Sequence, residues 1–514
     1  MRLHVAVLLA TASLAQFPLA PLTKAQDDLG WRISPQNINI QVGEDRRLQL
    51  LDDSAKELQG ATWAVDALSL AELQNQDGHV VVHALAEGTV RVSATIGSQT
   101  RYREIRIWPL SQQLPPGTTH WGVRPVGREI RDLAAVPTPS GPNQYSLEQT
   151  PDFTTYLRAN ADDGIQLWSW TMPEKTPDVE LVCGDWLGGA LLSANRASSF
   201  ILYSVGIDGK TRWQHEIPGV RKGHSISLQQ QVFILSQLND GTAARLTVFN
   251  EQSGDKEFQL PLPPSHETEF IIAQDGARTV CATNTLPTAV SRVSVNMDGF
   301  TYLAFTRTER TLRVPRCGDQ PSPRTSLAPV DELIVWQVHP DGTLRSTVAI
   351  SNSSNQPLSG ASLAASPTGE IITDNNYGLL MSVRMTHPLN SASRSQPADE
   401  FVYRLDPEGN ILFAIPMPKY AGQLHDEMVI GQDNIAFATR GGLVVAFDLT
   451  HGKDLWHWDS GANGVTVFAA LANGDVLVQT PAALVEVHDA DTAKELMQGK
   501  FIMDWQGHLY RKHN

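Results

Sequence analysis

Two short segments combine histidine with carboxylates, the side chains that bind metal ions or transfer protons in many enzymes. Neither has the spacing of a metalloprotease helix, in which two histidines four residues apart bind zinc from one face. We therefore interpret both as solvated loop residues. They are His266 with Glu267 and Glu269, and His425 with Asp426 and Glu427.

Acidic residues directly precede glycine at nine places in the sequence, and at six of these we asked whether a calcium loop could begin. Such a loop needs several oxygen ligands at alternating positions and a bidentate acid, and the segment from Asn160 to Gly164 supplies only the beginning of one. Asp-Gly pairs are also typical of tight turns. We expect turns and no calcium at Asp163, Asp208, Asp275, Asp298, Asp341 and Glu408.

Motifs of other enzyme classes are missing from the sequence. It contains no GxSxG nucleophile elbow, no phosphate-binding Gly-Lys-Ser/Thr loop and no CxxC spacing for zinc or redox chemistry. Paired carboxylates for glycoside hydrolysis stay open, because their separation is a property of the folded chain. The acidic residues are too numerous to choose among.

Three cysteines allow at most one disulfide. Cys281 and Cys317 are the favoured pair, because both border a long irregular region; the alternative is three separate thiols, with Cys183. Disulfides are therefore not the main source of stability.

Composition limits the classes of partner and fold. The chain of 514 residues has 40 Lys and Arg against 55 Asp and Glu, a formal charge of −15, so we expect no nucleic-acid or anionic-membrane partner. With 41% hydrophobic and 18% charged residues it is not a disordered polymer. The 38 glycines and 31 prolines among short apolar runs predict strands and turns.

The first 25 residues have the pattern of an export signal. Arg2 and His4 precede an apolar run, and small residues suit cleavage after Ala25 or, less well, Ala15. A membrane anchor needs about 20 apolar residues, and Pro18 and Lys24 interrupt this run early. No other stretch is long enough to span a bilayer, and no cysteine offers a lipid anchor. We expect an exported protein, periplasmic or extracellular.

Residues 31–108 contain short apolar runs with strand-like alternation, separated by turns. They predict a small antiparallel β-sandwich with Trp63 between its sheets. The segment resembles the bacterial group 2 Ig-like domain in Val42-Gly43-Glu44, Thr62-Trp63-Ala64-Val65 and the run from Glu87 to Ala94. This resemblance implies a spacer or adhesion module without catalysis. Residues 109–130, rich in proline, are expected to form a linker.

A different pattern repeats over residues 131–514: an apolar strand, a turn glycine and, four residues later, a large side chain. Its period is about 44 residues, which is typical of β-propeller blades. The glycine supplies the positive φ of the turn, and the large residue is expected to dock against a neighbouring blade. Asn160, Asn250, Asp448 and Asp489 should bind the turn amides. The repeats are Gly164 with Trp168, Gly209 with Trp213, Gly254 with Phe258, Gly409 with Phe413 and Gly452 with Trp456, with weaker copies at Gly342 with Ser346 and Ala493 with Met497.

These repeats resemble those of the pyrroloquinoline-quinone-like (quinoprotein-type) propellers, most specifically from Ala446 to Trp456 and in part from Ile207 to Trp213. The resemblance implies an all-β chain with seven or eight blades. An eighth blade would come from residues 268–305, or from residues 501–510 pairing with the chain that follows Trp121. Residues 310–330 and 388–399 lack periodicity and are expected to form loops.

The resemblance indicates the fold and not the cofactor. Enzymes of that family carry a ring of two adjacent cysteines against pyrroloquinoline quinone (PQQ), and this sequence has no adjacent pair. We considered PQQ and calcium and expect no cofactor.

The leading hypothesis is a secreted, non-catalytic binding or scaffold protein whose propeller face binds a protein or glycan, with the Ig-like domain as spacer or adhesion module. The alternative is a propeller enzyme: a degenerate quinoprotein dehydrogenase, or a hydrolase or lyase acting on an extracellular polymer. The enzyme hypothesis predicts that acidic, histidine and arginine side chains of several blades meet at the channel mouth. The sequence leaves the oligomeric state open.

Overall fold

The computed structural model describes most of the chain from residue 30 onward. The expected signal segment, residues 421–427 with His425, and most of the two expected loops lie outside the described residues. The described residues are 30–514 except 77–78, 113–118, 124–126, 137–141, 143, 319–329, 352–363, 374–377, 387–398, 419–427, 432–433, 463, 504–508 and 513–514.

The predicted all-β class is confirmed: within the described ranges the elements are β-strands, and none of them is an α-helix. No helix in that part of the chain is long and apolar enough to cross a membrane. The chain divides into two compact units at Leu110 and Ser111.

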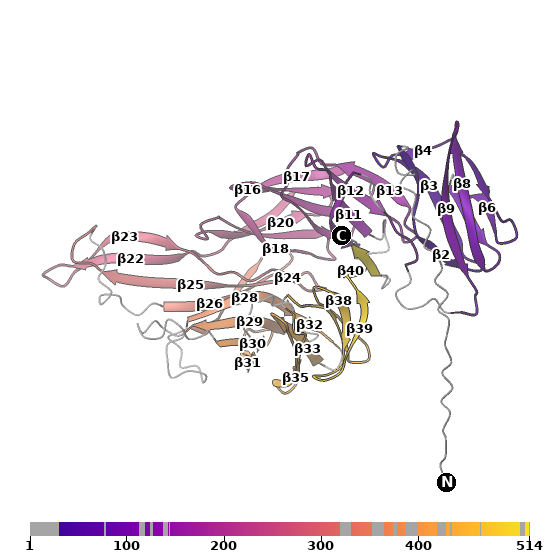
Figure 1. Ribbon diagram of the computed structural model, residues 1–514. Coiled ribbons are helices and arrows are strands. Elements are labelled where there is room, and N and C mark those ends of the chain that lie inside the picture. Colours follow the sequence, from indigo (N-terminus) through magenta and orange to yellow (C-terminus); the bar gives the residue numbers. More distant parts are fainter. Residues whose placement is uncertain are drawn as a thin grey trace, which may run out of the picture. The chain divides into compact units, whose positions relative to one another are not determined.

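The N-terminal unit is a sandwich of two sheets (Figure 1). Neighbouring strands are antiparallel except for β2 and β9, which are parallel. The first sheet has the order β1 (Trp31–Ser34), β3 (Asp45–Asp52), β7 (His79–Ala84), β6 (Ala71–Gln76), with β4 (Glu57–Leu58) beside β3; the second has the order β2 (Ile38–Gln41), β9 (Gln99–Trp108), β8 (Gly88–Ile96), β5 (Thr62–Val65).

Alternate residues of both sheets form one apolar core, which includes Ile40, Leu50 and Val92. Trp63 does not lie at the centre of this core as predicted. It is half-buried because β5 is an edge strand, and it packs against the core from there. Trp31 is more fully buried, with 7% of its surface exposed.

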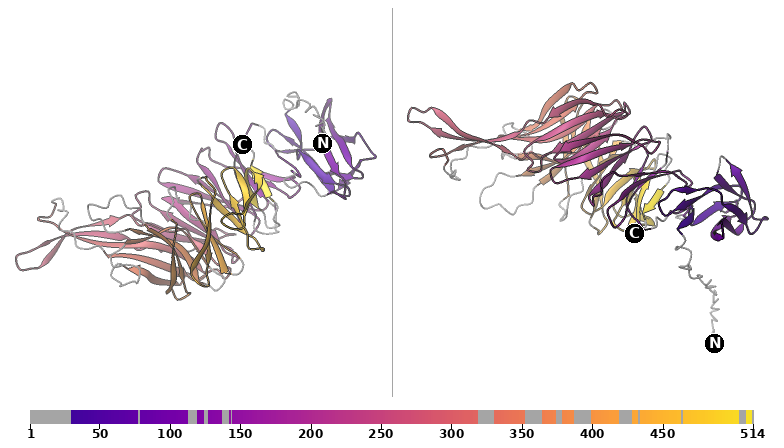
Figure 2. Two further views of the ribbon diagram at one scale, coloured as in Figure 1. Left: turned by 60° about the horizontal axis from the view of Figure 1, so that its bottom comes forward. Right: turned by 90° about the horizontal axis from the view of Figure 1, so that it is seen from above.

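The C-terminal unit consists of successive sheets, each built mainly from consecutive strands (Figure 2). The first three are β10 (Glu129–Ala135), β11 (Gln144–Gln149), β12 (Thr155–Asn160), β13 (Gln166–Thr171); β14 (Val179–Gly184), β15 (Ala190–Asn195), β16 (Ser199–Val205), β17 (Thr211–Pro218); and β18 (Val220–Ile226), β19 (Gln231–Gln237), β20 (Ala244–Asn250), β21 (Lys256–Pro261).

The fourth sheet is larger than the others. Residues 268–305 belong to it, so they do not form an eighth blade. Its order is β23 (Arg278–Leu286), β22 (Ser265–Ile272), β25 (Thr301–Arg313), β26 (Val330–Val338), β27 (Leu344–Ser351), with β24 (Ser294–Val295) beside β25.

Three further four-stranded sheets and a two-stranded one complete the unit. They are β28 (Ala364–Thr373), β29 (Leu379–Thr386), β30 (Asp399–Leu405), β31 (Ile411–Pro416); β32 (Met428–Ile430), β33 (Ile435–Arg440), β34 (Leu443–Asp448), β35 (Lys453–Asp459); β36 (Thr466–Ala470), β37 (Val476–Gln479), β38 (Ala483–Val487), β39 (Ala493–Gln498); and β40 (Lys500–Met503), β41 (Leu509–Lys512).

The sheets form a closed ring, because each contacts the next and the last contacts the first. Several of these contacts join first strands, as in the pairs β10 and β14, β28 and β32, and β32 and β36, so the first strands lie innermost. The β40–β41 hairpin contacts β38 on one side and β10 on the other. The C-terminal unit is therefore a β-propeller with seven large sheets, closed by the hairpin as an eighth blade.

Apolar clusters fill the spaces between successive large sheets, as the docking hypothesis requires. The first sheet sends Leu147 and Leu157 into the cluster that it shares with the second sheet. Its other face is polar: Glu148 and Arg158 alternate with these leucines along the strands and point to the opposite side. That side faces the closing hairpin, so the ring closes across a polar seam.

Candidate functional site

The predicted blade-docking rings lie against turn glycines of the following sheet. A Cβ atom added to Gly209 would be 2.8 Å from the ring of Trp168, and one added to Gly452 would be 2.8 Å from Phe413. A Cβ atom on Gly254 would overlap the ring of Trp213. Each ring thus covers a glycine about 40 residues later in the chain.

Two members of the series differ from the expected pairs. The ring of Phe258 lies 3.1 Å from a Cβ atom added to Gly342. A Cβ atom added to Gly409 would lie 2.7 Å from Thr347, the residue after Ser346 of the weaker copy. Trp456 packs with its ring centroid 5.9 Å from that of Phe437, in the apolar cluster shared with the seventh sheet.

Trp121 is a docking residue that the sequence pattern missed. Its indole N–H donates to the carbonyl oxygen of Asp162 at 2.6 Å, just as Trp168 donates to Ile207 at 2.6 Å, two residues before Gly209. Gly164 is likewise two residues beyond Asp162 and has a φ of 84°. The sequence did carry a signal, because Gly117 stands four residues before Trp121, the spacing of the repeat, but both residues lie in the expected linker and were not assigned to a blade.

Trp121 also contacts the closing hairpin. Its ring centroid lies 6.0 Å from that of Tyr510 on β41. The expected proximity between the C-terminal segment and the chain near Trp121 is therefore present, and it places Trp121 between the eighth and first blades.

Replacing Gly254 by alanine should lower the free energy of unfolding by about 2–6 kcal/mol, because a positive φ costs an L residue about 1–3 kcal/mol and overpacking against Trp213 adds about 1–3 kcal/mol. Gly276→Ala is the matched control: its φ of 83° is similar to the 75° of Gly254, but nothing lies within 4 Å of its added Cβ. Urea unfolding checks the difference. Equal losses in both variants would contradict the close ring contact.

The turn interpretation is confirmed at all six acid–glycine pairs, and four of them share one hydrogen-bond pattern. Their carboxylates accept hydrogen bonds from the amide two residues later, at distances from 2.8 to 3.2 Å. At the other two pairs the acceptors are Asn296 and Asp406 instead. No described group of three or more His, Cys, Asp or Glu side chains is placed to hold a metal ion. The four residues whose carboxylates accept from the amide two residues later are Asp163, Asp208, Asp275 and Asp341.

The residues four positions before the turn glycines behave in two ways. Asn250, Asp448 and, in the degenerate copy, Asp489 accept from two turn amides each, as predicted. Asn160 does not: it is buried, and its Oδ1 has no hydrogen-bond partner. Its side chain lies on the polar face of the first sheet, away from the turn.

His266 and Glu267 lie in strand β22, which corrects the loop interpretation. The Nδ1 atom of His266 is 3.3 Å from Glu309, and Glu267 binds Arg310 at 3.3 Å. Both partners lie on β25, which runs parallel to β22. These residues therefore form cross-strand pairs and not an acid–base site.

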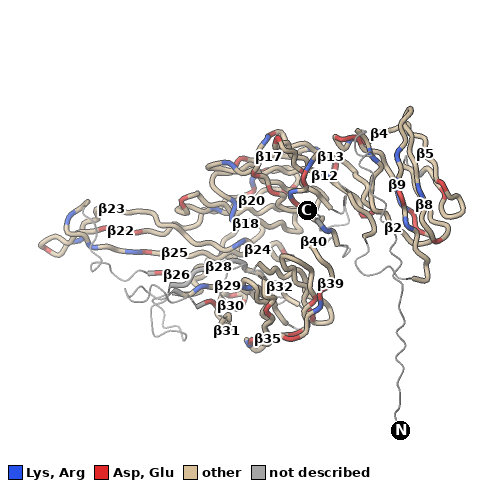
Figure 3. Tube along the Cα trace, viewed as in Figure 1, with Lys and Arg blue, Asp and Glu red and all other residues tan. Residues whose placement is uncertain are grey.

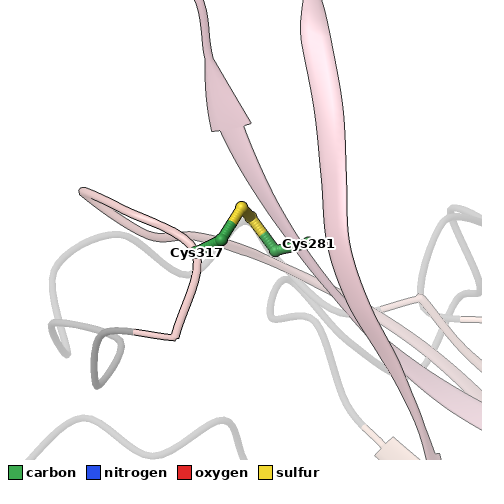
Figure 4. The surroundings of a disulfide bond; sticks show 2 residues. All are labelled: Cys281 and Cys317. Carbon is green, nitrogen blue, oxygen red and sulfur yellow. A yellow bond between two sulfur atoms is a disulfide. The ribbon is translucent and has the colours of Figure 1, made fainter.

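The predicted disulfide between Cys281 and Cys317 is confirmed (Figure 4). Cys183 is a free thiol on the inner strand β14. Burial raises its pKa to about 12. It is therefore a protonated and unreactive thiol at neutral pH.

One cluster on the inner strands joins an acid, an arginine and a histidine from two blades. Arg221 on β18 forms an ion pair with Glu180 on β14 and donates to Nδ1 of His224 at 2.9 Å. Burial, followed by the charges of Arg221 and Arg292, lowers the pKa of His224 to about 4. His224 is thus neutral at pH 7, and it is a weaker base than a general base poised near that pH.

The depressed pKa of His224 predicts a pH-dependent loss of stability. Its ordinary value of 6.5 falls to about 4 in the folded chain, so protonation favours unfolding as the pH falls from about 6.5 to 4. Between pH 7 and 4 the wild type should lose about 2–3 kcal/mol more than His224→Gln, which keeps an acceptor for Arg221. Urea unfolding at both pH values checks this. Parallel pH profiles would contradict it.

Comparisons with known proteins reveal only distant likenesses in structure. No protein-family model and no curated protein matches the chain. Solved structures that resemble it include the Dos1 propeller (9% identity, 87% of this chain and 92% of that chain, TM-score 0.39). Another is a quinoprotein alcohol dehydrogenase-like protein from Bacteroides thetaiotaomicron (9%, 82% and 93%, TM-score 0.28). A third is the dihydro-heme d1 dehydrogenase NirN (12%, 74% and 71%, TM-score 0.40). Function must therefore be argued from this chain's own residues.

Proposed function

We propose that the protein is an exported, non-catalytic binding or scaffold protein. Its propeller presents the surface for a protein or glycan partner, and the N-terminal sandwich acts as a spacer or adhesion module. The observation that carries this proposal is the enlarged fourth blade.

The fourth blade has strands that the ring itself does not need. β22, β23 and the end of β25 extend beyond the other blades (Figures 1 and 2). β23 is largely exposed, and a disulfide fixes it to the chain beyond β25. Ordering such a segment costs conformational entropy without filling the core, and elaborated surface segments of this kind commonly carry binding functions.

The strand order of the N-terminal unit supports an Ig-like identity. Named by position along the chain, its sheets follow the orders A-B-E-D and A′-G-F-C, which are those of Ig-like sandwiches. A module of this kind, without the charged inner cluster of the propeller, suits the role of spacer.

The disulfide supports export to the periplasm or the extracellular space. Disulfides persist in oxidising compartments and are rare where thiols are kept reduced. The Cys281–Cys317 bond therefore agrees with the signal-like residues 1–25.

A capture experiment tests the binding proposal. The full chain is immobilised and exposed to periplasmic extract and culture fluid, with heat-denatured chain as the control. We expect a saturable protein or glycan species on the folded chain alone. Equal material on both surfaces would count against a binding function.

The enzyme alternative is favoured by one observation, the Glu180–Arg221–His224 cluster on the inner strands. It predicts that an extracellular polymer is cleaved and that Glu180→Gln abolishes the cleavage. For the quinoprotein form, PQQ with Ca²⁺ at 100 times the dissociation constant should stabilise the chain by about 2.7 kcal/mol. We propose that no cofactor is bound, and an unchanged thermal midpoint is the expected result.

A further inference from the structure

We propose that the free edge of β23 binds an extended segment of a partner protein in which acidic and apolar residues alternate. This inference rests on the proposed binding function and assigns it to the arm, which we define as β22, β23 and residues 309–318.

The arm ends in a strand with a free edge. β23 is the outermost strand of its sheet and pairs with β22 alone among the described strands. Six of its nine residues, including those from Arg278 to Val280, are exposed, and they lie on both faces. Its outward N–H and C=O groups can therefore accept a further strand, the mode of recognition known as β-augmentation.

The edge of β23 lacks the features that usually prevent such pairing. Its sequence contains one charged residue, Arg278 at its start, and no proline or lysine. Several edge strands elsewhere in the ring carry charges, and the uncharged edge strands β13 and β31 bury apolar side chains against the next blade. The charged examples are β17, β21, β35 and β39, each of which carries an acidic residue.

The outer part of the arm presents an apolar surface flanked by arginines. The register places Val280 and Arg313 on either side of Phe270, and Ile272 opposite Arg278. Val280 is 60% exposed and Ile272 is 40% exposed. Because paired residues share a face of a sheet, these side chains form one continuous patch.

The charge of this patch selects the partner. Arg278 and Arg313 are exposed, and neither forms an ion pair with any residue that the structure describes. Arg278 instead covers the ring of Phe270 at 5.0 Å. Of the acidic residues elsewhere on the arm, Glu267 pairs with Arg310 and Glu309 lies 3.3 Å from His266, and Figure 3 shows both signs along the arm. The guanidinium groups of Arg278 and Arg313, on the same face of the sheet as Val280, complement carboxylates that alternate with apolar side chains.

The disulfide holds the edge in place. Cys281 lies in the middle of β23, directly after Val280, and Cys317 lies beyond the end of β25 (Figure 4). An edge that is fixed before binding loses less conformational entropy when a partner strand is added.

Fluorescence anisotropy with a defined probe tests the inference. The probe is a fluorescein-labelled peptide of ten alternating valine and glutamate residues, titrated with the full chain. We expect saturable binding that weakens at least about tenfold in Val280→Glu and in Arg278→Glu. Leu412→Glu is the matched control, because Leu412 is 53% exposed on the edge strand β31. Circular dichroism verifies that each variant is folded.

Two further peptides separate the contributions. A valine–lysine peptide should bind much more weakly, and N-methylation of the valine–glutamate peptide should abolish binding by blocking the backbone pairing. Failure of the wild type to bind the valine–glutamate probe would overturn the inference, as would equal binding by Val280→Glu. A dimer of this chain that Val280→Glu dissolves in sedimentation would make a second copy the occupant and also overturn it.

The capture experiment distinguishes this inference from the proposed function. If the wild type and Val280→Glu capture the same species equally, the arm is not the site but the binding function stands. If neither captures any species, the binding function itself fails.

Discussion

Replacing Trp213 by alanine should lower the free energy of unfolding of the propeller by about 3–5 kcal/mol. Trp213 is 7% exposed and its ring covers Gly254. Its indole N–H donates to the carbonyl oxygen of Glu251 at 2.8 Å. Truncation removes a buried ring from between two blades and leaves that acceptor unpaired. Urea unfolding monitored by circular dichroism measures the loss.

Trp456→Ala is the matched comparison. Trp456 belongs to the repeat with the most specific sequence, but it is half-buried and the next blade has Ala493 where a turn glycine stands elsewhere. We therefore expect a smaller loss than for Trp213→Ala. An equal or larger loss would show that burial between blades does not set the strength of docking.

Replacing Glu148 by alanine should cost about 3–5 kcal/mol, because it leaves two buried arginines without their counter-ion. The carboxylate of Glu148 lies 2.8 Å from the guanidinium of Arg158 and 3.5 Å from that of Arg128. All three side chains are at most 4% exposed. Desolvation already lowers the pKa of Arg158, which reflects the difficulty of keeping its charge in this seam.

The surface pair of Arg196 and Glu216 supplies the control for this variant. Their atoms are 3.1 Å apart, but both side chains are about half exposed. Glu216→Ala should therefore change the unfolding free energy little. If Glu148→Ala proved equally mild, the seam between the first blade and the closing hairpin would have to be hydrated.

The seam matters because the ring closes there. Every other pair of adjacent large sheets shares an apolar cluster. Here the ring of Trp121 packs against Tyr510 of the hairpin, and the Glu148 network lies within the first blade beside this contact. Closure at this position therefore includes an aromatic contact between segments about 390 residues apart in the chain. Loss of the contact between Trp121 and Tyr510 is expected to open the ring at this position first.

The sequence predicted the repeat because its signal is local. A turn glycine and a ring four residues later are set by one hairpin, so Gly209 and Trp213 could be paired without knowledge of the fold. Which glycine each ring covers depends on the neighbouring blade and became clear only in the structure. Trp121 escaped detection because its blade is completed by the C-terminal hairpin, far away in the sequence.

The arm and the inner cluster could not be predicted for related reasons. The segment containing His266 and Cys281 lacks the blade period because β22 and β23 are additions to a blade, so the sequence predicts a loop at His266 and offers residues 268–305 as a source of an eighth blade. Glu180 and His224 are separated by more than 40 residues, and only the placement of β14 and β18 at the inside of the ring brings them together. Chain spacing carries no information about such contacts.

The most direct test of a binding function is quantitative capture on the immobilised full chain from periplasmic extract and culture fluid, with both protein and glycan analysed in the retained material. The account predicts one species that saturates the folded chain, is absent from denatured chain, and is released unchanged. Retention of nothing beyond the denatured control, or release of the species in cleaved form, would contradict the account.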